Sequence, residues 1–474
     1  ASCVANLNAL LEGYKEAAML NPIYDPLYVI DVNETRYYLA DSYEVSEDGM
    51  QITVKLKEGL KWHDGEAITA DDMIFTMDVC SDTNNGAGGT NIVILNDQPV
   101  KYEKVDDLTV KVTLPMASAS YADLLGGLTL IPEHVFEGNP SVVSAGEANM
   151  KGIGSGPYKV TEFKQDEYLL LEKYEDYYMG APSIDKVTFR IISDLSAQEV
   201  ALMNGEVNFM ELANAPAVAK YEADPNFTVV KYPEGRVNYL AVNKFCETVQ
   251  DPKVVEAVFA ALNRDEIIAG AYGDGMAESA NSIFSNVNTF YDPSVEGYTQ
   301  DVEKAKQLVK ETGLDSKTLT LYFNSERVYM KESAQIIQQQ LKNVGINLEV
   351  IPLESAGFFE KVFGTDGDYE FYLNGYGAVG DPDQVVAGMY DGTWGVNLAV
   401  SDEVSQLWKD ARTVYTPEER AAIYKQIQIQ TRDELTCYPI AYPNYVFVTT
   451  SNIKGADTIK RTPVFEDYTK LTME

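Results

Sequence analysis

Residues 39–72 read LADSYEVSEDGMQITVKLKEGLKWHDGEAITADD, and this order predicts a β-hairpin followed by a helix. Apolar residues alternate with polar ones over 52–56, after a turn at 46–49, which is typical of a hairpin with one buried face. Thr69 and Asp72 have the spacing of a capping box, so we expect a helix to begin directly after Thr69. By themselves these signals indicate an ordinary α+β unit.

Further short motifs follow along most of the chain. They are A-D-S-Y-E-V-S-E-D-G, W-H-D-G and T-A-D-D within residues 39–72, G-S-G-P-Y-K-V at 154–160, Y-L-A-V-N at 239–243, Q-Q-Q-L with G-I within 338–346, and G-D-P-D at 380–383. In this order the motifs resemble the family 5 extracytoplasmic solute-binding proteins, which are the receptors of ABC importers for peptides, nickel and related solutes. The resemblance covers nearly the whole chain. It implies an α/β, two-lobed periplasmic-binding-protein fold (type II, cluster C-like) with an extra small inserted domain.

The length and charge of the chain agree with this class of protein. Its 474 residues exceed the roughly 250 to 300 that one core usually serves, so we expect at least two lobes. Against 37 Lys and Arg stand 73 Asp and Glu, which gives a formal charge of -36. Such a surface repels nucleic acid and anionic lipid, and we expect neither as a partner. Solubility explains this charge, and attraction of cationic ligands is the alternative explanation.

The cysteines and the N-terminus bear on compartment and anchoring. Cys3, Cys80, Cys246 and Cys437 are far apart and form no C-x-x-C pair, so neither a zinc site nor a dense disulfide framework is indicated, and one long-range disulfide stays open. No apolar run approaches the roughly 20 residues that span a bilayer, and Ala1-Ser2-Cys3 lacks the regions of a signal peptide. In Gram-positive members of the resembled family a lipid-modified cysteine tethers the receptor. Cys3 is therefore a candidate anchor.

The remaining pattern alternates strands with helices, which predicts an α/β lobe. We expect strands at 109–114, 168–172 and 187–192, and helices at 196–204, 252–263, 301–312, 331–344 and 417–434. The resemblance implies a discontinuous lobe I over 1–38, 152–243 and 446–474, an inserted small domain over 39–151, and lobe II over 244–445. It also implies that the lobes close around a ligand bound between them.

Catalysis is not indicated by the residue inventory. The chain has two histidines: His63 lies in the W-H-D-G turn, and His134 follows a proline at a predicted helix start, so structural roles are favoured for both. No G-x-S-x-G, H-E-x-x-H or G-x-x-x-x-G-K-[ST] motif is present. We predict no catalytic residue, no metal site and no cofactor. Two alternatives stay open: a secreted acidic glycoside hydrolase that uses two of the many carboxylates, and a peptide-sensing receptor of the same fold.

The segment Glu326-Arg327-Val328-Tyr329 precedes the predicted helix at 331–344. In peptide-binding members of the resembled family, an arginine and a tyrosine at this place face the ligand. An arginine can hold a carboxylate with two parallel hydrogen bonds. We therefore predict Arg327 and Tyr329 as ligand contacts, and the alternative is a surface arginine that pairs with an acid such as Glu332.

Residues 374–383 read NGYGAVGDPD and match the ligand-binding loop of the resembled family. Peptide receptors of the family place an aspartate for the ligand's amine a few residues before G-D-P-D, whereas the matching places here hold Ala378 and Val379. A buried ammonium without a counter-charge is costly, so either another acid replaces this aspartate or the ligand has no free N-terminus. Gly377 and Ala378 are candidate contacts. The two aspartates of G-D-P-D are predicted to cap the helix that follows.

Aromatic residues supply the other candidate contacts. Tyr376, Trp394 and Tyr24 are predicted walls of the ligand site, because each offers a flat apolar face with one polar group. Asn397 is a candidate for hydrogen bonding to the ligand. The shortage of histidine argues against direct metal ligation, although a chelated ion could bind through its organic carrier.

Together these observations predict a non-enzymatic, extracytoplasmic receptor. We expect it to capture a peptide or another small solute and to deliver it to the transmembrane subunits of an ABC permease. We expect a monomer that contacts the membrane only through a lipid anchor.

Overall fold

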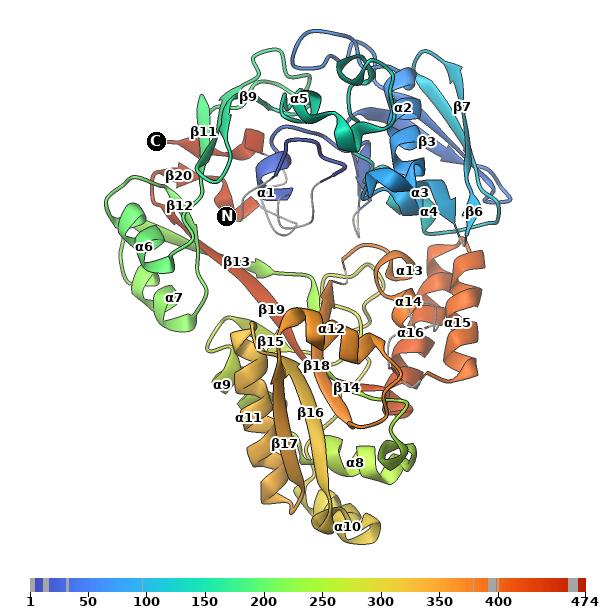
Figure 1. Ribbon diagram of the computed structural model, residues 1–474, viewed down its shortest axis with the longest axis vertical. Helices are drawn as coiled ribbons and strands as arrows, with labels where there is room; N and C mark the ends of the chain where they lie inside the picture. Colours follow the sequence, from blue (N-terminus) through green and yellow to red (C-terminus); the bar gives the residue numbers. More distant parts are fainter. Residues whose placement is uncertain are drawn as a thin grey trace. The chain divides into compact units, whose positions relative to one another are not determined.

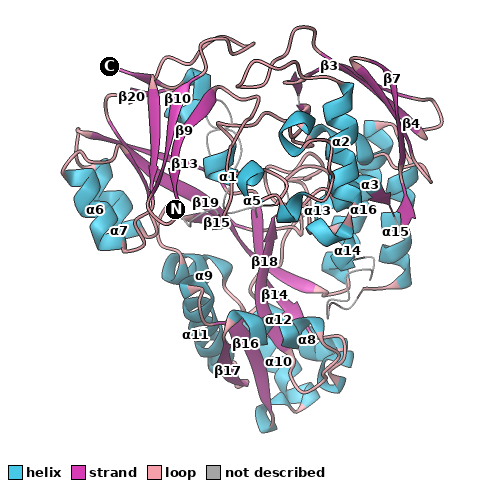
Figure 2. Ribbon diagram, turned by 45° about the horizontal axis from the view of Figure 1, so that its top comes forward, coloured by secondary structure: helices cyan, strands magenta, loops and turns pink. Residues whose placement is uncertain are grey.

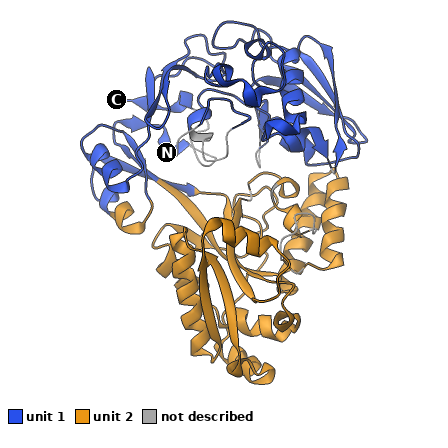
Figure 3. Ribbon diagram, viewed as in Figure 1, with its two compact units in different colours: residues 1–212, 220–232, 447–474 blue, residues 213–219, 233–446 orange. Residues whose placement is uncertain are grey.

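The computed structural model (Figure 1) describes residues 5–11, 17–30, 34–95, 97–377, 379–390, 398, 400–458 and 468–474. Both units contain helices as well as strands (Figure 2). It divides into two compact units (Figure 3): unit 1 comprises residues 1–212, 220–232 and 447–474, and unit 2 comprises 213–219 and 233–446. The finer domain bounds expected from the sequence, including a separate segment over 39–151, stay predictions.

Unit 1 contains the predicted hairpin and helix. Strands β3 (Ala40–Val45), β4 (Gln51–Leu56), β8 (Thr109–Thr113) and β7 (Lys101–Asp106) form a four-stranded antiparallel sheet in that order. Ile52, Val54 and Leu56 are buried, as the alternation predicts. Helix α2 (Ala70–Ser81) packs on β7 and β8, and Thr69 with Asp72 forms the predicted capping box.

A second sheet of unit 1 follows the G-S-G-P-Y-K-V motif. Strands β9 (Tyr158–Lys164), β10 (Tyr168–Lys173) and β11 (Lys186–Arg190) are antiparallel, with β10 in the middle. Strand β12 (Phe209–Glu211) pairs with the last residues of β19 (Cys437–Thr450).

Helix α6 (Leu195–Met203) matches its predicted range, but its burial differs from the spacing argument. The helical spacing of Ala197, Val200, Ala201 and Met203 predicts that they share one apolar face. The structure buries Ala201 with Leu202, and leaves Val200 and Met203 58% and 52% exposed. Helical spacing identifies residues that share a face, but it does not say whether another element covers that face.

Unit 2 is built on a sheet whose central strand is β14 (Arg236–Val242). β14 is antiparallel to β18 (Phe371–Gly377) on one side and to β19 on the other. Beyond β18 lie β16 (Thr318–Asn324) and β17 (Asn347–Leu353), both parallel to their neighbours, and β15 (Ala277–Ser279) pairs with β19. Leu240, Leu319 and Leu321 lie in the core of this sheet.

The predicted helices of unit 2 are confirmed with small shifts in their ends. They are α8 (Pro252–Ala261), α10 (Val302–Thr312), α11 (Val328–Asn343) and α16 (Pro417–Asp433), together with α9 (Arg264–Ala271), α12 (Ser355–Phe363) and α15 (Asp402–Thr413). Helix α11 packs on β16, β17 and α9, as Figure 2 shows. It begins three residues before its predicted start, directly after Arg327.

Shorter elements complete the described chain. They are α1 (Ala17–Leu20), β1 (Tyr28–Ile30), β2 (Thr35–Tyr37), α3 (Thr90–Val93), β5 (Ile94–Leu95), β6 (Gln98–Pro99), α4 (Tyr121–Gly126), α5 (Gly146–Asn149), α7 (Ala215–Glu222), β13 (Phe227–Pro233), α13 (Pro382–Val385), α14 (Ala387–Tyr390), β20 (Ile453–Lys454) and β21 (Thr472–Met473).

The cysteines of the described chain are free. Cys80, Cys246 and Cys437 are buried thiols, and Cys3 lies outside the described residues. Among the helices that the structure describes, none combines the length and the apolarity required to cross a membrane.

His63 connects two of the sequence motifs within unit 1. Its backbone N–H donates to the carbonyl of Gly154 (3.0 Å), and its Nδ1 accepts from the Gly154 N–H (3.1 Å). Because Nδ1 accepts, Nε2 carries the proton and donates to the carbonyl of Gly156 (2.9 Å). Gly154 must be glycine, since a Cβ there would lie 2.0 Å from the carbonyl oxygen of Ile23. The W-H-D-G turn and the G-S-G-P turn are therefore one structural unit.

Replacing His63 should show how much this connection stabilises the fold. In His63→Ala the Gly154 N–H and the Gly156 carbonyl lose their partners, and the free energy of unfolding should fall by about 2 to 4 kcal/mol. Burial lowers the pKa of His63 to about 4 from its usual 6.5. As the pH falls, His63 of the unfolded chain therefore binds a proton before His63 of the folded chain does. The stability that neutral His63 contributes is present above pH 6.5 and is lost as the pH falls towards 4.

Urea unfolding of wild type and His63→Ala between pH 4 and 7.5 measures both effects. The two stability curves should converge as the pH falls, and parallel curves would contradict the interpretation. His134→Ala is the matched control, because that histidine is 38% exposed and pairs with the partly exposed Asp64, and such surface pairs contribute at most about 1 kcal/mol.

Candidate functional site

The residues predicted as ligand contacts lie in different parts of the described structure. Arg327 and Tyr329 lie at the start of α11, and Tyr376 and Gly377 end β18, all in unit 2. Tyr24 lies in unit 1. Ala378, Trp394 and Asn397 lie outside the described residues.

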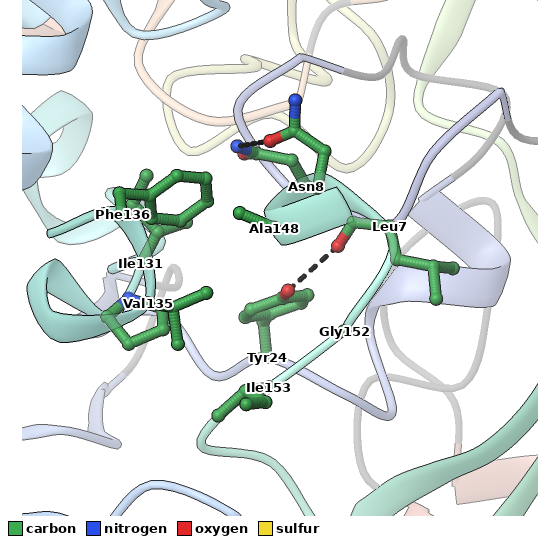
Figure 4. A pocket seen from close by; sticks show the side chains of 11 residues that line it. Leu7, Asn8, Tyr24, Ile131, Val135, Phe136, Ala148, Gly152 and Ile153 are labelled. Carbon is green, nitrogen blue, oxygen red and sulfur yellow. Dashed lines mark hydrogen bonds between the residues drawn. The ribbon is translucent and has the colours of Figure 1, made fainter. Parts of the chain in front are cut away.

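Tyr24 lines a small pocket that belongs to unit 1 alone (Figure 4). Its hydroxyl donates to the carbonyl of Leu7 (2.8 Å), and the ring faces the apolar side chains of Ile131 and Val135. Only 7% of Tyr24 is exposed, and burial raises the pKa of its hydroxyl. The polar group that was expected to face a ligand is therefore bonded to the backbone.

Tyr376 is likewise a core residue of unit 2. Its hydroxyl donates to the carbonyl of Ile283 (2.6 Å) and lies 3.1 Å from the Tyr390 hydroxyl. Its ring packs against Tyr239, at 5.2 Å between centroids. Gly377 is exposed and lies opposite Arg236 in the ladder between β14 and β18.

Arg327 and Tyr329 are brought together with polar groups of β14. Arg327 is a partly buried residue, and its guanidinium makes no hydrogen bond or ion pair with any described residue, Glu332 included. The ring of Tyr329 stacks on Tyr272, at 5.3 Å and 29°. The neighbouring Glu326 is engaged elsewhere, because its carboxylate accepts from the N–H and the hydroxyl of Ser355.

Sequence reasoning missed the polar residues at the start of β14. Arg236 and Asn238 alternate on one face of β14, and Glu234 precedes the strand by two residues; we call these three residues the β14 polar row. Arg236 Nη2 donates to the carbonyl of Gly375 (2.8 Å), and Asn238 Nδ2 donates to the Tyr272 hydroxyl (2.8 Å). The period of two in E-G-R-V-N was the available signal, and the resemblance drew attention to the apolar residues that follow it.

The β14 polar row and Arg327 form a charge cluster. Burial raises the pKa of the Glu234 carboxyl, whereas the positive charges of Arg236 and Arg327 lower this pKa. Two guanidinium groups and one carboxylate give this cluster a net charge of +1 when all three are ionised. Such a cluster favours a further anion over a cation.

A small pocket of unit 2 lies between β14, β18, β19 and the first two turns of α11. It has room for about one water molecule, and it is lined by Asn238, Tyr239, Tyr272, Tyr329, Met330, Ser333, Leu373, Asn374 and Ile440. Asn238 Oδ1, the Tyr329 hydroxyl and Ser333 Oγ are buried atoms of its wall without a hydrogen-bond partner in the described structure. We call it the Asn238 pocket.

The G-D-P-D loop is held by arginines. Asp381 accepts from the Asp383 N–H (3.1 Å), which confirms it as the cap of α13. The same carboxylate makes a two-pronged ion pair with Arg420, at 2.6 and 2.9 Å. The prediction that Asp383 also caps the helix is wrong, because its carboxylate pairs with Arg412 at 2.5 Å.

The matching place of the amine-binding aspartate is apolar. Val379 packs against Gly235, whose φ is +70°, and a Cβ on Gly235 would lie 1.9 Å from the Val379 side chain. No group of three or more His, Cys, Asp or Glu residues suited to a metal ion occurs within the part of the chain that is described.

Comparison with known proteins gives consistent matches. Residues 34–397 match the model of the bacterial extracellular solute-binding proteins, family 5 (middle). The chain is 26% identical over 469 residues to the dipeptide-binding protein of Escherichia coli K12, covering 92% of this chain and 86% of that protein. It is 31% identical over 379 residues to a putative ABC transporter peptide-binding protein of Brucella ovis, with 77% and 70% covered.

Solved structures agree over almost the full length. A putative peptide-binding protein AppA from Clostridium difficile is 34% identical with a TM-score of 0.91, covering 98% of this chain and 99% of that one. The ABC transporter substrate-binding protein CtaP from Listeria monocytogenes is 33% identical with a TM-score of 0.92, covering 100% and 98%. The oligopeptide-binding protein AppA from Bacillus subtilis, in complex with a nonapeptide, is 26% identical with a TM-score of 0.77, covering 100% and 97%.

The ion pair between Asp381 and Arg420 should be a major source of stability for the loop. Both side chains are less than 10% exposed, so Asp381→Asn leaves a buried guanidinium without its counter-charge. We expect the free energy of unfolding to fall by about 3 to 5 kcal/mol in urea titrations followed by circular dichroism. Glu256→Gln is the control, because its partner Lys304 is 50% exposed and the loss should stay below about 1 kcal/mol. Equal losses in the two variants would contradict this assignment.

Proposed function

Because the chain belongs to the family 5 bacterial extracellular solute-binding proteins, we propose that its solute is a peptide and that Arg327 holds the peptide's carboxylate. The protein is an extracytoplasmic solute-binding protein that captures its ligand for delivery to an ABC permease. The names of its relatives support the peptide assignment: the Escherichia coli relative is a dipeptide-binding protein, and the Bacillus subtilis AppA was solved with a nonapeptide.

The state of Arg327 is the observation that carries the carboxylate assignment. Arg327 is a partly buried residue that makes no hydrogen bond or ion pair with a described residue, and the Glu234 carboxyl acts on it only at longer range, so a further anionic partner would be favourable. Arg236 lies in the same cluster, and its Nε is buried without a hydrogen-bond partner. The cluster therefore offers a carboxylate both net positive charge and N–H donors.

The ligand's amine needs a different arrangement from the one in the resembled peptide receptors. Position 378 is alanine and Val379 packs against Gly235, so neither supplies a carboxylate. Glu234 is an acid of the same cluster, but Arg236 and Arg327 already act on it. We propose that the carboxylate end of the ligand is the fixed end, and that the amine is held less strictly.

The alternatives from the sequence are weaker proposals. The family consists of solute-binding proteins, and we propose that this chain has no catalytic role. A peptide-sensing receptor would use the same site and differ only in its downstream partner. A lipid anchor at Cys3 and a monomeric state stay predictions.

Removal of Arg327 tests the proposal. After unfolding and refolding to strip bound ligand, wild type should bind trialanine more tightly than trialanine amide, which lacks the carboxylate. In Arg327→Ala the affinity for trialanine should fall by about 1.5 to 3 kcal/mol, whereas the affinity for the amide should change little. Isothermal titration calorimetry measures both.

Lys331→Ala is the matched control, since Lys331 is an exposed cation on the same helix. It should leave both affinities unchanged. If Arg327→Ala binds trialanine as wild type does, Arg327 is not the carboxylate anchor.

A further inference from the structure

The carboxylate of Glu234 belongs to the same charge cluster that is proposed to hold the ligand's carboxylate. We propose that Glu234 is an internal counter-ion which competes with the ligand for Arg236 and Arg327, so that binding of a carboxylate ligand is coupled to the uptake of a proton by Glu234. This inference rests on the proposed function, because it takes the ligand's carboxylate to be held by this cluster.

The backbone fixes Glu234 close to Arg236. The N–H of Glu234 donates to the carbonyl of Pro443 on β19 (2.9 Å). Gly235, the next residue, has a φ of +70° and turns the chain into β14. Arg236 is the first residue of β14, and its Nη2 donates to the carbonyl of Gly375 on β18 (2.8 Å). Glu234 and Arg236 are therefore anchored to one sheet, two residues apart.

Two tyrosines bring Arg327 to the same part of β14. The Tyr272 hydroxyl accepts from Asn238 Nδ2 (2.8 Å), and the Tyr272 ring stacks on Tyr329, at 5.3 Å between centroids. Arg327 lies two residues before Tyr329, directly before α11. Its guanidinium acts on the Glu234 carboxyl. This carboxylate is therefore shared by cations of two different elements.

The cluster is accessible to a ligand, because Glu234, Arg236 and Arg327 are all partly exposed residues. Tyr272, which follows α9, also interacts with Glu234. Burial and nearby charges, that of Glu234 included, raise the pKa of the Tyr272 hydroxyl, so this group stays neutral. The charged residues of the neighbouring strands are engaged elsewhere: Lys231 of β13 pairs with Glu222, and Glu278 of β15 accepts from Asn286. Strands β18 and β19, which are described in full, contain no Asp, Glu, Lys, Arg or His.

A ligand carboxylate in this cluster changes the proton affinity of Glu234. Burial raises the pKa of the Glu234 carboxyl, and the two arginines lower it. A second carboxylate takes part of the positive charge of the arginines and adds a negative charge nearby, so the pKa of Glu234 rises further in the complex. The affinity for the ligand must then rise as the pH falls through this range. The ligand's own carboxyl, with a pKa of about 3.5, would give the opposite dependence.

Isothermal titration calorimetry with trialanine between pH 5 and 7 measures this coupling, because both termini of the peptide stay mostly charged in this range. The affinity of wild type should rise by about fivefold from pH 7 to pH 5. At pH 6, binding should take up about half a proton, measured from the dependence of the heat on the ionisation enthalpy of the buffer. Trialanine amide, which lacks the carboxylate, should show neither effect.

Glu234→Gln removes both the competing charge and the titrating group. This variant should bind trialanine about tenfold more tightly than wild type at pH 7 and about twofold more tightly at pH 5, without proton uptake at pH 6. Glu349→Gln is the matched control, because Glu349 is an exposed acid of β17 in the same unit. Its pH profile should equal that of wild type.

Two results would overturn the inference. If Glu234→Gln binds trialanine more weakly than wild type, Glu234 orients the arginines and does not compete with the ligand. If wild type binds trialanine without taking up a proton, the coupling does not exist, whatever the stability of the variant. If wild type does not bind trialanine at all, the proposed function itself fails, and this inference fails with it.

Discussion

Strand β14 has a sheet neighbour on each side, and this constraint fixes the candidate site of unit 2. Asn238 lies opposite Gly375 of β18 and Ala441 of β19, so its position is set by two ladders of backbone hydrogen bonds. Residue 375 must be glycine, since a Cβ there would lie 2.0 Å from Asn238 Oδ1. The carbonyl of Gly375 then accepts from Arg236. Burial on a central strand makes unpaired polar groups destabilising, but the same packing holds these groups rigidly in place. Such rigid positioning prepares a binding site for its ligand.

In unit 1 the corresponding constraint is the imidazole of His63. Its two ring nitrogens and its backbone N–H bind the G-S-G-P turn, which lies about 90 residues further along the chain. Two glycines of that turn, Gly154 and Gly156, allow its backbone to approach that of Ile23. A substitution in either motif would leave buried polar groups of the other without partners. This mutual dependence explains in physical terms why the two motifs are found together in one chain.

Much of the fold was predictable because it follows from local rules. The hairpin over residues 40–56 follows from a period of two, and the start of α2 follows from the capping box at Thr69. The site was only partly predictable. Arg327 and Tyr329 lie together as expected, but the β14 polar row was missed, because polar residues in a mostly apolar strand gain meaning only from the α11 side chains beside them.

The same limit explains why Tyr376 is not an exposed wall. Its position in a loop motif suggested a ligand-facing ring, but β18 is an interior strand, and alternation turns Tyr376 towards the core with Tyr239. Its hydroxyl then finds a backbone carbonyl, as a buried tyrosine must. Sequence spacing can assign such a residue to a strand, but the face it occupies depends on the register of that strand with its neighbours.

The charge of the protein poses the remaining question, since a chain of formal charge -36 is proposed to bind a carboxylate. The distances over which charges act resolve it. Exposed charges further apart than a Debye length of about 8 Å are largely screened by salt, so most of the 73 acids contribute little at any one point. Arg236 and Arg327 act on the Glu234 carboxyl in a partly buried place, where screening is weaker and the interaction is stronger. The local cluster of net charge +1 therefore decides which group binds there, while the global charge governs solubility and the approach of ligands.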